Sequence, residues 1–401
     1  MTKVLLGLDL VQNKQKSILE GKRLAILGNQ ASCDSNLNHI LDIITALPNV
    51  TVLKLFAPEH GFRGELQDME EITHSQDKRT GLPIISLYGS SEASLTPRPE
   101  DLEDIDAIVF DLQEVGSRYY TYAQTLRFAM EACKDQGKEV IVLDRPNPIG
   151  DAIEGAPLEA DCRSFCGYAP VANRHGMTIG ELAVMMNEGA TVAGVSIPAI
   201  NVSLTVVKME HYKREMYFDE TGVPWVIPSP NMPTLDTAIV YPGMCLIEAT
   251  DISEARGTTR PFELVGASFI DGFAWKQAFE KLNLGLEGFL LRPTSFVPKF
   301  QKSAGKYCGG LQIHVTDRAT FKPYRVALGL IYAVKTLYPQ EFSWRNQAYE
   351  FVDKVPAIDL LHGSHEFRKA VETGSGLAKL FAQMTAFEKE FSEARKAFLL
   401  Y

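Results

Sequence analysis

Short apolar runs alternate with segments of helical periodicity over the first 150 residues. The apolar runs predict strands at 23–27, 51–57, 83–87, 107–110 and 139–143, and the periodic segments predict helices at 36–47 and 120–134. This alternation is typical of βαβ units, in which crossover helices join neighbouring parallel strands. The pattern therefore predicts an α/β fold built on a mostly parallel sheet.

The pattern becomes richer in loops beyond Gly150. A helix is expected to begin at Thr178, because Thr178 and Glu181 have the spacing of a capping box. We therefore expect Glu181 to be structural rather than catalytic. The segment Trp225–Pro233 contains too much proline for a helix or a central strand, so it is expected to line a cleft or to link two domains.

The sequence after the proline-rich segment predicts a smaller α+β unit. Strand-like runs occur at 238–247 and 311–315, and helices are expected at 324–338 and 376–399. A chain of 401 residues is also longer than one hydrophobic core usually organises. We expect two domains, residues 1–235 and 236–401, with the second closing a cleft.

Polar residues gather directly after the predicted strands. They are Asn29 and Gln30, Glu59 and His60, Gln113 and Glu114, and Asp144, Arg145 and Asn147. The carboxyl ends of parallel strands share one edge of a sheet, and ligands bind at that edge in open α/β folds. The chain has neither a G-x-G-x-x-G nor a G-x-x-x-x-G-K-[ST] motif, so no nucleotide site is predicted.

Composition narrows the classes of partner. A net charge of −10 and a pI near 5.4 argue against nucleic acid or an anionic membrane as the partner. No apolar run is long enough to span a bilayer, and the N-terminus lacks the features of a signal peptide. As written, the protein is expected to be cytoplasmic, and extracytoplasmic if a leader has been removed.

No metal or other cofactor is predicted. Cys162 and Cys166 are the closest pair among six scattered cysteines, and no second pair with ligand spacing accompanies them. His362 and His365 occur in His-Gly-Ser-His-Glu, which does not match the H-E-x-x-H motif of zinc hydrolases. A serine hydrolase is also disfavoured, because the chain lacks a G-x-S-x-G motif.

Two acids from different loops are the first requirement of glycoside hydrolysis. Glu59 and Glu114 are the pair that the strand pattern favours, with His60 beside Glu59 as a third catalytic candidate. The plainer alternatives are a solvated turn for Glu59 and a salt bridge to Arg118 for Glu114. The second catalytic group stays open: Glu114, a tyrosine or a water held by His60.

Several residues have the chemistry to bind a saccharide. Tyrosines suit stacking on a sugar ring, and an arginine at a helix N-terminus suits a carboxylate. Simple core packing is the alternative for the tyrosines, and an Asp-Arg ion pair that braces a turn is the alternative for Arg145. The substrate-binding candidates are Arg118, Tyr119, Tyr122, Arg145, Asn147, His175, Asn231, Glu254 and Arg260.

Six blocks, in one order, resemble a known family. They are Phe56–Gly61, Asp111–Tyr122, Leu143–Gly150, His175–Ala183, Pro228–Thr234 and Arg256–Glu263. In these blocks the chain is similar to bacterial exo-β-N-acetylmuramidases of the NamZ type, formerly a domain of unknown function. The resemblance runs nearly end to end. It departs at Glu114, where the family usually has aspartate, and at Ala255, where it has glycine.

The resemblance implies a Rossmann-like N-terminal domain, a smaller C-terminal domain and an active site between them. It also implies a glycosidase that releases N-acetylmuramic acid from the non-reducing end of peptidoglycan fragments, with Glu59 as the matching catalytic glutamate. The lactyl carboxylate of that sugar needs a cation, for which Arg118, Arg145 and Arg260 are candidates in that order.

A peptidoglycan-derived saccharide is therefore the expected partner, and the oligomeric state is not predicted. The alternatives are a muropeptide-binding or sensing protein, another amino-sugar glycosidase, or a carbohydrate esterase on the same scaffold.

Overall fold

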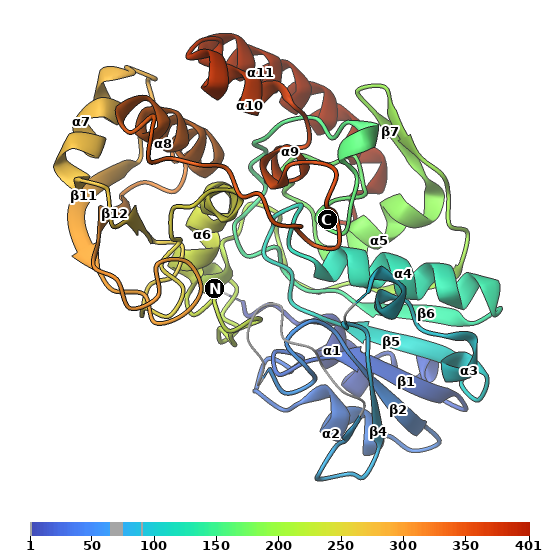
Figure 1. Ribbon diagram of the computed structural model, residues 1–401. Helices are drawn as coiled ribbons and strands as arrows, with labels where there is room; N and C mark the ends of the chain where they lie inside the picture. Colours follow the sequence, from blue (N-terminus) through green and yellow to red (C-terminus); the bar gives the residue numbers. More distant parts are fainter. Residues whose placement is uncertain (1, 65–74, 90) are drawn as a thin grey trace.

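A computed structural model describes residues 2–64, 75–89 and 91–401, and its largest element is a seven-stranded sheet (Figure 1). Six neighbouring strands are parallel, and the short edge strand β3 (Ser75–Gln76) is antiparallel to β4. In spatial order the parallel strands are β4 (Pro83–Ser86), β2 (Thr51–Ala57), β1 (Arg23–Gly28), β5 (Ala107–Asp111), β6 (Glu139–Leu143) and β9 (Ser203–Val207). The predicted α/β class is confirmed.

Helices cover both faces of this sheet. Successive residues of a strand point to opposite faces, so Ile108 and Phe110 of β5 belong to one core and Ala107 and Val109 to another. The first core lies beneath α4 (Tyr122–Asp135) and α5 (Ile179–Glu188), and the second beneath α1 (Gly7–Asn13) and α2 (Ile40–Thr45). Each fully buried large apolar side chain stabilises the fold by about 1.5–3 kcal/mol.

A second unit follows, built on an antiparallel sheet in the order β10 (Leu264–Ala267), β12 (Cys308–Val315), β11 (Phe289–Phe296). Helices α6 (Leu235–Met244), α7 (Gly272–Lys281) and α8 (Pro323–Leu337) pack together with it. The backbones approach so closely that a Cβ at Gly310 would lie 2.0 Å from the Val265 carbonyl oxygen. The predicted smaller α+β unit is confirmed.

The strand predicted at 238–247 was wrong, because this segment forms helix α6 and a 3₁₀ turn at Cys245–Ala249. The helix is apolar on every side, since every residue from Thr237 to Met244 is buried. An apolar run without helical periodicity does not distinguish a buried helix from a buried strand. The missed signal was Thr234, whose side chain caps the helix by accepting from the Thr237 backbone N–H at 3.3 Å.

The end of the chain crosses back to the large sheet. Three helices follow the second unit: α9 (Ala357–His362), α10 (Glu366–Thr373) and α11 (Leu377–Ala394). The last of them, α11, lies against β7 (Ala190–Val192), which pairs with β8 (Val195–Ile197) in a hairpin (Figure 1). A short turn at Arg395–Phe398 then contacts α5. This return was not predicted from sequence.

Within the described ranges, no helix combines the length and the apolar composition that crossing a membrane requires.

Candidate active site

A pocket opens beyond the carboxyl end of β2, where the large sheet meets the second unit. Three parts of the sheet unit line it: the turn after β2, the start of α4 and the proline-rich loop before α6. The second unit contributes residues from the 3₁₀ turn at Cys245–Ala249, the loop that follows it and the segment after α8. The polar lining residues include Glu59, His60, Thr121, Ser229, Asn231, Glu248, Arg256 and Glu350.

The backbone after β2 places Glu59 in this pocket. Pro58 follows the last strand residue, and the Gly61 N–H donates to the Pro58 carbonyl at 3.1 Å to close a tight turn. His60 within that turn has a φ of 73°, a left-handed conformation that non-glycine residues adopt mostly at functional sites or turns. The Glu59 carboxylate accepts from the Thr121 hydroxyl at 3.0 Å, at the N-cap of α4.

Two further glutamates reach the pocket from the second unit. Glu248 accepts from the Arg256 guanidinium at 2.7 Å through Oε1 and from the Tyr349 hydroxyl at 2.6 Å through Oε2. Glu350 accepts from the Tyr88 hydroxyl at 3.4 Å. Carboxylates from both units therefore meet in one cavity.

Arg256 ties Glu248 into a chain of charges. Its Nε donates to Glu254 Oε1 at 3.0 Å, and Lys302 lies 2.7 Å from the other Glu254 oxygen. Although burial acts to raise the pKa of Glu254, Lys302 and Arg256 hold it below its ordinary value. Glu254, a predicted binding residue, does not line this pocket, but it pairs with Arg256 and lines the larger hollow next to the pocket.

Tyrosines form one wall of the pocket. The Tyr119 hydroxyl donates to the Pro242 carbonyl within α6, and the Tyr122 hydroxyl donates to the Pro228 carbonyl at 2.7 Å. Rings of Tyr120 and Tyr122 meet edge to face, with centroids 4.9 Å apart. Burial raises the pKa of all three phenols, which keeps them neutral near pH 7.

Asn231 supplies a polar group to the same cavity. It is 7% exposed and lines the pocket, and its Nδ2 has no hydrogen-bond partner among the described residues. A buried amide donor without a partner costs about 1–3 kcal/mol, a cost that a ligand acceptor would remove. The proline-rich loop thus lines a cleft, one of the two roles expected for it.

A larger hollow of about 500 Å³ adjoins the pocket and shares Glu248, Tyr349 and Glu350 with it. Lys302, Trp344 and Arg345 also line this hollow. Within the described part of the chain, the Arg345 side chain makes one hydrogen bond, from Nη2 to the Ala348 carbonyl at 3.3 Å. The Arg345 guanidinium therefore has N–H groups that could donate to a ligand in the hollow.

Glu114 and His175 lie outside the pocket lining. Glu114 accepts from the Gly116 and Ser117 backbone N–H groups at 2.6 and 3.0 Å, and His175 Nε2 lies 3.4 Å from it. His175 Nδ1 accepts from the Met177 N–H at 3.1 Å. Both side chains shape the loop before α4, and the salt bridge to Arg118 weighed for Glu114 does not form.

Arg118 is 2% exposed and donates to four backbone carbonyls. Nη1 bonds Ala156 and Val171 at 3.0 Å each, and Nη2 bonds Leu361 and His362 at 3.2 and 2.7 Å. Burial lowers its pKa, yet these carbonyl dipoles solvate the cation. Arg118 therefore joins the loop before α4 to α9 and does not face the pocket.

The remaining predicted cations are also committed elsewhere. Arg145 pairs with Asp111, with Nη2 at 2.9 Å from Oδ2, and so braces its turn as the plainer alternative expected. The neighbouring Asn147 donates to the Met177 carbonyl at 3.0 Å. Arg260 pairs with Glu263 at 3.1 Å beside a separate surface hollow.

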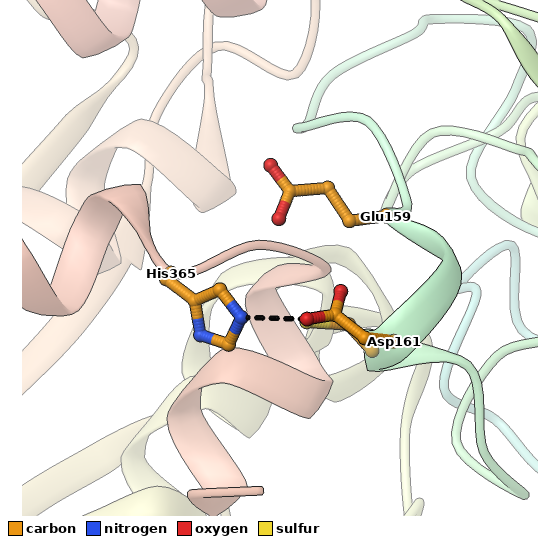
Figure 2. A group of neighbouring side chains, drawn as sticks. Glu159, Asp161 and His365 are labelled. Atoms are coloured by element: carbon orange, nitrogen blue, oxygen red, sulfur yellow. Dashed lines mark hydrogen bonds and ion pairs between the residues drawn. The ribbon is translucent and has the colours of Figure 1, made fainter.

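One group of side chains has the donor types of a metal site. Glu159, Asp161, Cys162 and His365 each offer an atom, and these atoms all lie within 4.8 Å of one another (Figure 2). None of the four lines the pocket described above.

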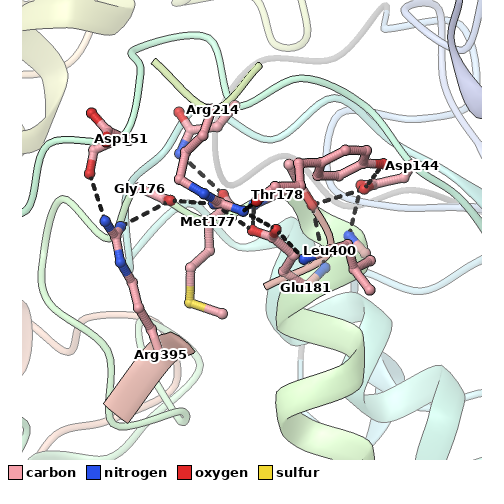
Figure 3. Close-up of polar contacts among 12 residues, drawn as sticks. Asp144, Asp151, Gly176, Met177, Thr178, Glu181, Arg214, Arg395 and Leu400 are labelled. Atoms are coloured by element: carbon pink, nitrogen blue, oxygen red, sulfur yellow. Dashed lines mark hydrogen bonds and ion pairs between the residues drawn. The ribbon is translucent and has the colours of Figure 1, made fainter. Parts of the chain in front are cut away.

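The loop after β6 is covered by the last residues of the chain (Figure 3). Asp144 accepts from the Tyr401 and Thr178 hydroxyls at 2.8 Å each, and Glu181 accepts from the Leu400 N–H at 2.8 Å. Arg395 donates to the Gly176 and Asp151 carbonyls at 3.0 and 3.1 Å. The capping box expected at Thr178 is confirmed.

The second unit contributes pocket residues that sequence reasoning missed. Tyr349 and Glu350 follow no predicted strand, and Glu248 follows the run at 238–247 that proved to be helix α6 rather than a strand, so the rule that located Glu59 did not identify them. Arg256 stands in one of the six family blocks, which was the available signal. Ala255 before it has a φ of 61°, a conformation that explains why glycine is usual there.

Comparisons with known proteins cover the whole chain. The family model described as exo-beta-N-acetylmuramidase NamZ, N-terminal, matches residues 24–236, and its C-terminal counterpart matches residues 239–401. The chain is 40% identical over 400 residues to the peptidoglycan beta-N-acetylmuramidase NamZ of Bacillus subtilis (strain 168), covering all of this chain and 92% of that protein.

Two solved structures of DUF1343 family proteins from Bacteroides fragilis NCTC 9343 have the same fold. One has 31% sequence identity and a TM-score of 0.87, and each chain covers all of the other. The second has 29% identity and a TM-score of 0.73, covering 100% of this chain and 99% of its own.

Proposed function

The chain belongs to the exo-β-N-acetylmuramidase NamZ family, and we propose that it is an exo-acting glycosidase that releases N-acetylmuramic acid from the non-reducing end of peptidoglycan fragments. The supporting observation is that Glu59 of the sheet unit shares a pocket with Glu248 and Glu350 of the second unit. Glycoside hydrolysis needs two carboxyl groups on either side of the scissile bond.

We assign Glu59 as the group that protonates the departing oxygen. Its carboxylate accepts from the Thr121 hydroxyl at 3.0 Å, and the residue lines the pocket directly after β2, where the Gly61 N–H closes a tight turn onto the Pro58 carbonyl. Glu248 is the second carboxylate in this proposal, because the Arg256 cation and the Tyr349 hydroxyl favour its ionised form. In this proposal Glu248 acts as base or nucleophile, and His60, which lines the same pocket, orients the water.

This assignment replaces Glu114 in the mechanism. The Glu114 carboxylate accepts hydrogen bonds from two backbone N–H groups and does not line the pocket. Glu248 differs in that its partners are side chains that themselves line the pocket.

Arg345 is the arginine proposed for the lactyl carboxylate. Arg118, Arg145 and Arg260 donate to protein acceptors outside the pocket, whereas Arg345 lines the adjoining hollow with unused donors among the described residues. A guanidinium can bind a carboxylate through two parallel hydrogen bonds.

A pair of chromogenic substrates tests the activity. We expect release from a β-N-acetylmuraminide and much slower release from the matching β-N-acetylglucosaminide, which lacks the lactyl group. Binding of the muraminide without release would support a sensing protein instead. Equal rates on both substrates would support another amino-sugar glycosidase, and loss of an acetyl group with the glycosidic bond intact would support an esterase.

Arg345→Ala tests the carboxylate assignment. We expect kcat/KM on the muraminide to fall by about 10-fold or more, the loss of one charge-assisted hydrogen bond, with little change on the glucosaminide. Arg292→Ala is the matched control, since Arg292 is exposed on β11 and bonds Gln312 at 2.6 Å. A proportional loss on both substrates would show that Arg345 does not read the lactyl group.

A further inference from the structure

We propose a zinc-binding site formed by Glu159, Asp161, Cys162 and His365, separate from the hydrolytic pocket. Three of these residues come from the turn around Ala160–Cys162, and the fourth is the N-cap of α10. In Figure 2 the Glu159 and Asp161 carboxylates and the His365 ring converge on one space.

The distances suit one ion. All four donor atoms lie within 4.8 Å of one another, and His365 Nε2 is 3.0 Å from Asp161 Oδ2. Tetrahedral zinc bonds of about 2.0–2.3 Å place neighbouring donors about 3.3–3.8 Å apart. Side-chain rotations that shorten the longer separations by about 1 Å would complete the set.

A fifth residue, outside the four donors, orients the imidazole. Asp359 is fully buried, and its Oδ2 lies 2.7 Å from His365 Nδ1. Arg368 donates to the same carboxylate at 2.8 Å and holds it in place. A carboxylate on one imidazole nitrogen fixes the tautomer that presents the other nitrogen to a metal, an arrangement that zinc sites use repeatedly.

The donor set selects the ion. A thiol and an imidazole favour zinc and related transition metals, whereas magnesium and calcium prefer oxygen donors alone. Binding exchanges the Cys162 thiol proton for the metal, and also the His365 Nε2 proton when that ring is charged. Two carboxylates and one thiolate then surround a divalent cation, which leaves a formal charge of −1.

The position gives the ion a structural role. The Glu159 N–H already donates to the Gly363 carbonyl at 2.7 Å, so the turn and the α9–α10 connection touch without metal. Four protein ligands would leave no open coordination position, which is typical of structural rather than catalytic zinc. The ion would fasten the returning end of the chain to the sheet unit.

Cobalt titration of the chelator-treated full chain tests the site. We expect one equivalent of Co²⁺ to produce visible d–d bands and a near-ultraviolet thiolate charge-transfer band, both removed by one equivalent of Zn²⁺. Zinc should also raise the Tm of the same protein. Absence of the thiolate band at stoichiometric cobalt would overturn the proposal and leave His365 as an ion-paired imidazolium between Asp161 and Asp359.

Variants distinguish this site from incidental binding. Asp161 has a side chain that is 65% exposed, so Asp161→Asn should fold normally and bind Zn²⁺ about 10-fold more weakly or worse. Cys162→Ser should remove the charge-transfer band, and His365→Gln should abolish stoichiometric binding. Cys166→Ser is the matched control, because Cys166 lies outside the four donors and should leave the spectrum unchanged. Retention of the band in Cys162→Ser would refute the assignment.

Discussion

Two loops at the same edge of the large sheet carry similar polar sequences and have different surroundings. The loop after β2 places Glu59 and His60 in a cavity shared with the second unit. The loop after β6 places Asp144 beneath the last residues of the chain (Figure 3), where Tyr401 donates to it. Arg145 in the same loop pairs with Asp111. Polar residues at the carboxyl ends of parallel strands are therefore not sufficient for a binding site. Whether they line a cavity depends on the segment that packs over them.

The difference is also energetic. A carboxylate that faces a cavity keeps its hydrogen-bonding capacity for a ligand, whereas one that is covered by protein contributes to stability. Substitutions in the first loop should therefore change turnover, and substitutions in the second should change the free energy of unfolding.

Glu59→Gln should produce the largest effect. We expect kcat to fall by about 10²–10⁴-fold, because glutamine cannot donate the proton that a general acid supplies. The measurement is steady-state hydrolysis of the chromogenic muraminide, with thermal unfolding alongside. Glu100→Gln, on the exposed surface of α3 (Pro99–Leu102), is the control that should change neither quantity. Near-normal turnover in the Glu59 variant would remove that residue from the mechanism.

Arg145→Met should affect stability instead. Removing this cation leaves Asp111, which is fully buried, as an uncompensated charge, at a cost of about 3–5 kcal/mol in the free energy of unfolding. Urea denaturation measures the loss, and Arg292→Met is the exposed control. A stable variant with lost turnover would place the β6 loop in the active site after all.

The β6 loop should also respond to pH. Burial, reinforced by the neighbouring Glu181, raises the pKa of Asp144 to about 6 from an ordinary value of 3.8. The folded state then holds a proton that the unfolded state releases, so stability falls as pH rises through this window. The shift from 3.8 to about 6 corresponds to about 3 kcal/mol in total, at about 1.36 kcal/mol per pKa unit, and we expect wild type to lose about 2 kcal/mol of this relative to Asp144→Asn between pH 4 and pH 6. A constant difference between the two proteins across that range would contradict the shift.

Tyr401→Phe should give the smallest effect. The lost hydroxyl donates to Asp144 at 2.8 Å and accepts from the Met209 N–H at 2.7 Å. Leaving these partners unsatisfied should lower the free energy of unfolding by about 1–2 kcal/mol without changing kcat. Tyr307→Phe is the control, since Tyr307 is 69% exposed. No change in unfolding would mean that the end of the chain does not stabilise the β6 loop.

The features that could be predicted were those determined by short stretches of sequence. The five strands expected before Gly150 were confirmed because apolar runs between turn residues identify buried strands, and the capping box at Thr178 was confirmed by its spacing. Helix α6 was missed because its apolar run has no periodicity. The position of Glu59 followed from the end of β2, which is also a local feature.

The other half of the pocket could not be inferred in this way. Glu248, Arg256 and Tyr349 are bonded to one another within the second unit. They share a pocket with Glu59 because α6 packs against Tyr119 and Tyr120, just before α4.

Arg118 shows the reverse case: it has the right chemistry and local position, but two of its four acceptors, the Leu361 and His362 carbonyls, come from a distant part of the chain. The packing of distant segments determines which polar residues line a cavity. That packing cannot be predicted from the local pattern of a single sequence.

Arg118 also constrains the order in which the molecule can assemble. Two of its four acceptors, the Leu361 and His362 carbonyls, lie far downstream in the chain. Until α9 docks, water must accept the hydrogen bonds that the guanidinium donates to these two carbonyls in the folded protein. The loop before α4 therefore cannot become fully buried before α9 is in place. That loop leads directly into the tyrosines that line the pocket, so we expect the proposed catalytic cavity to be completed late in folding.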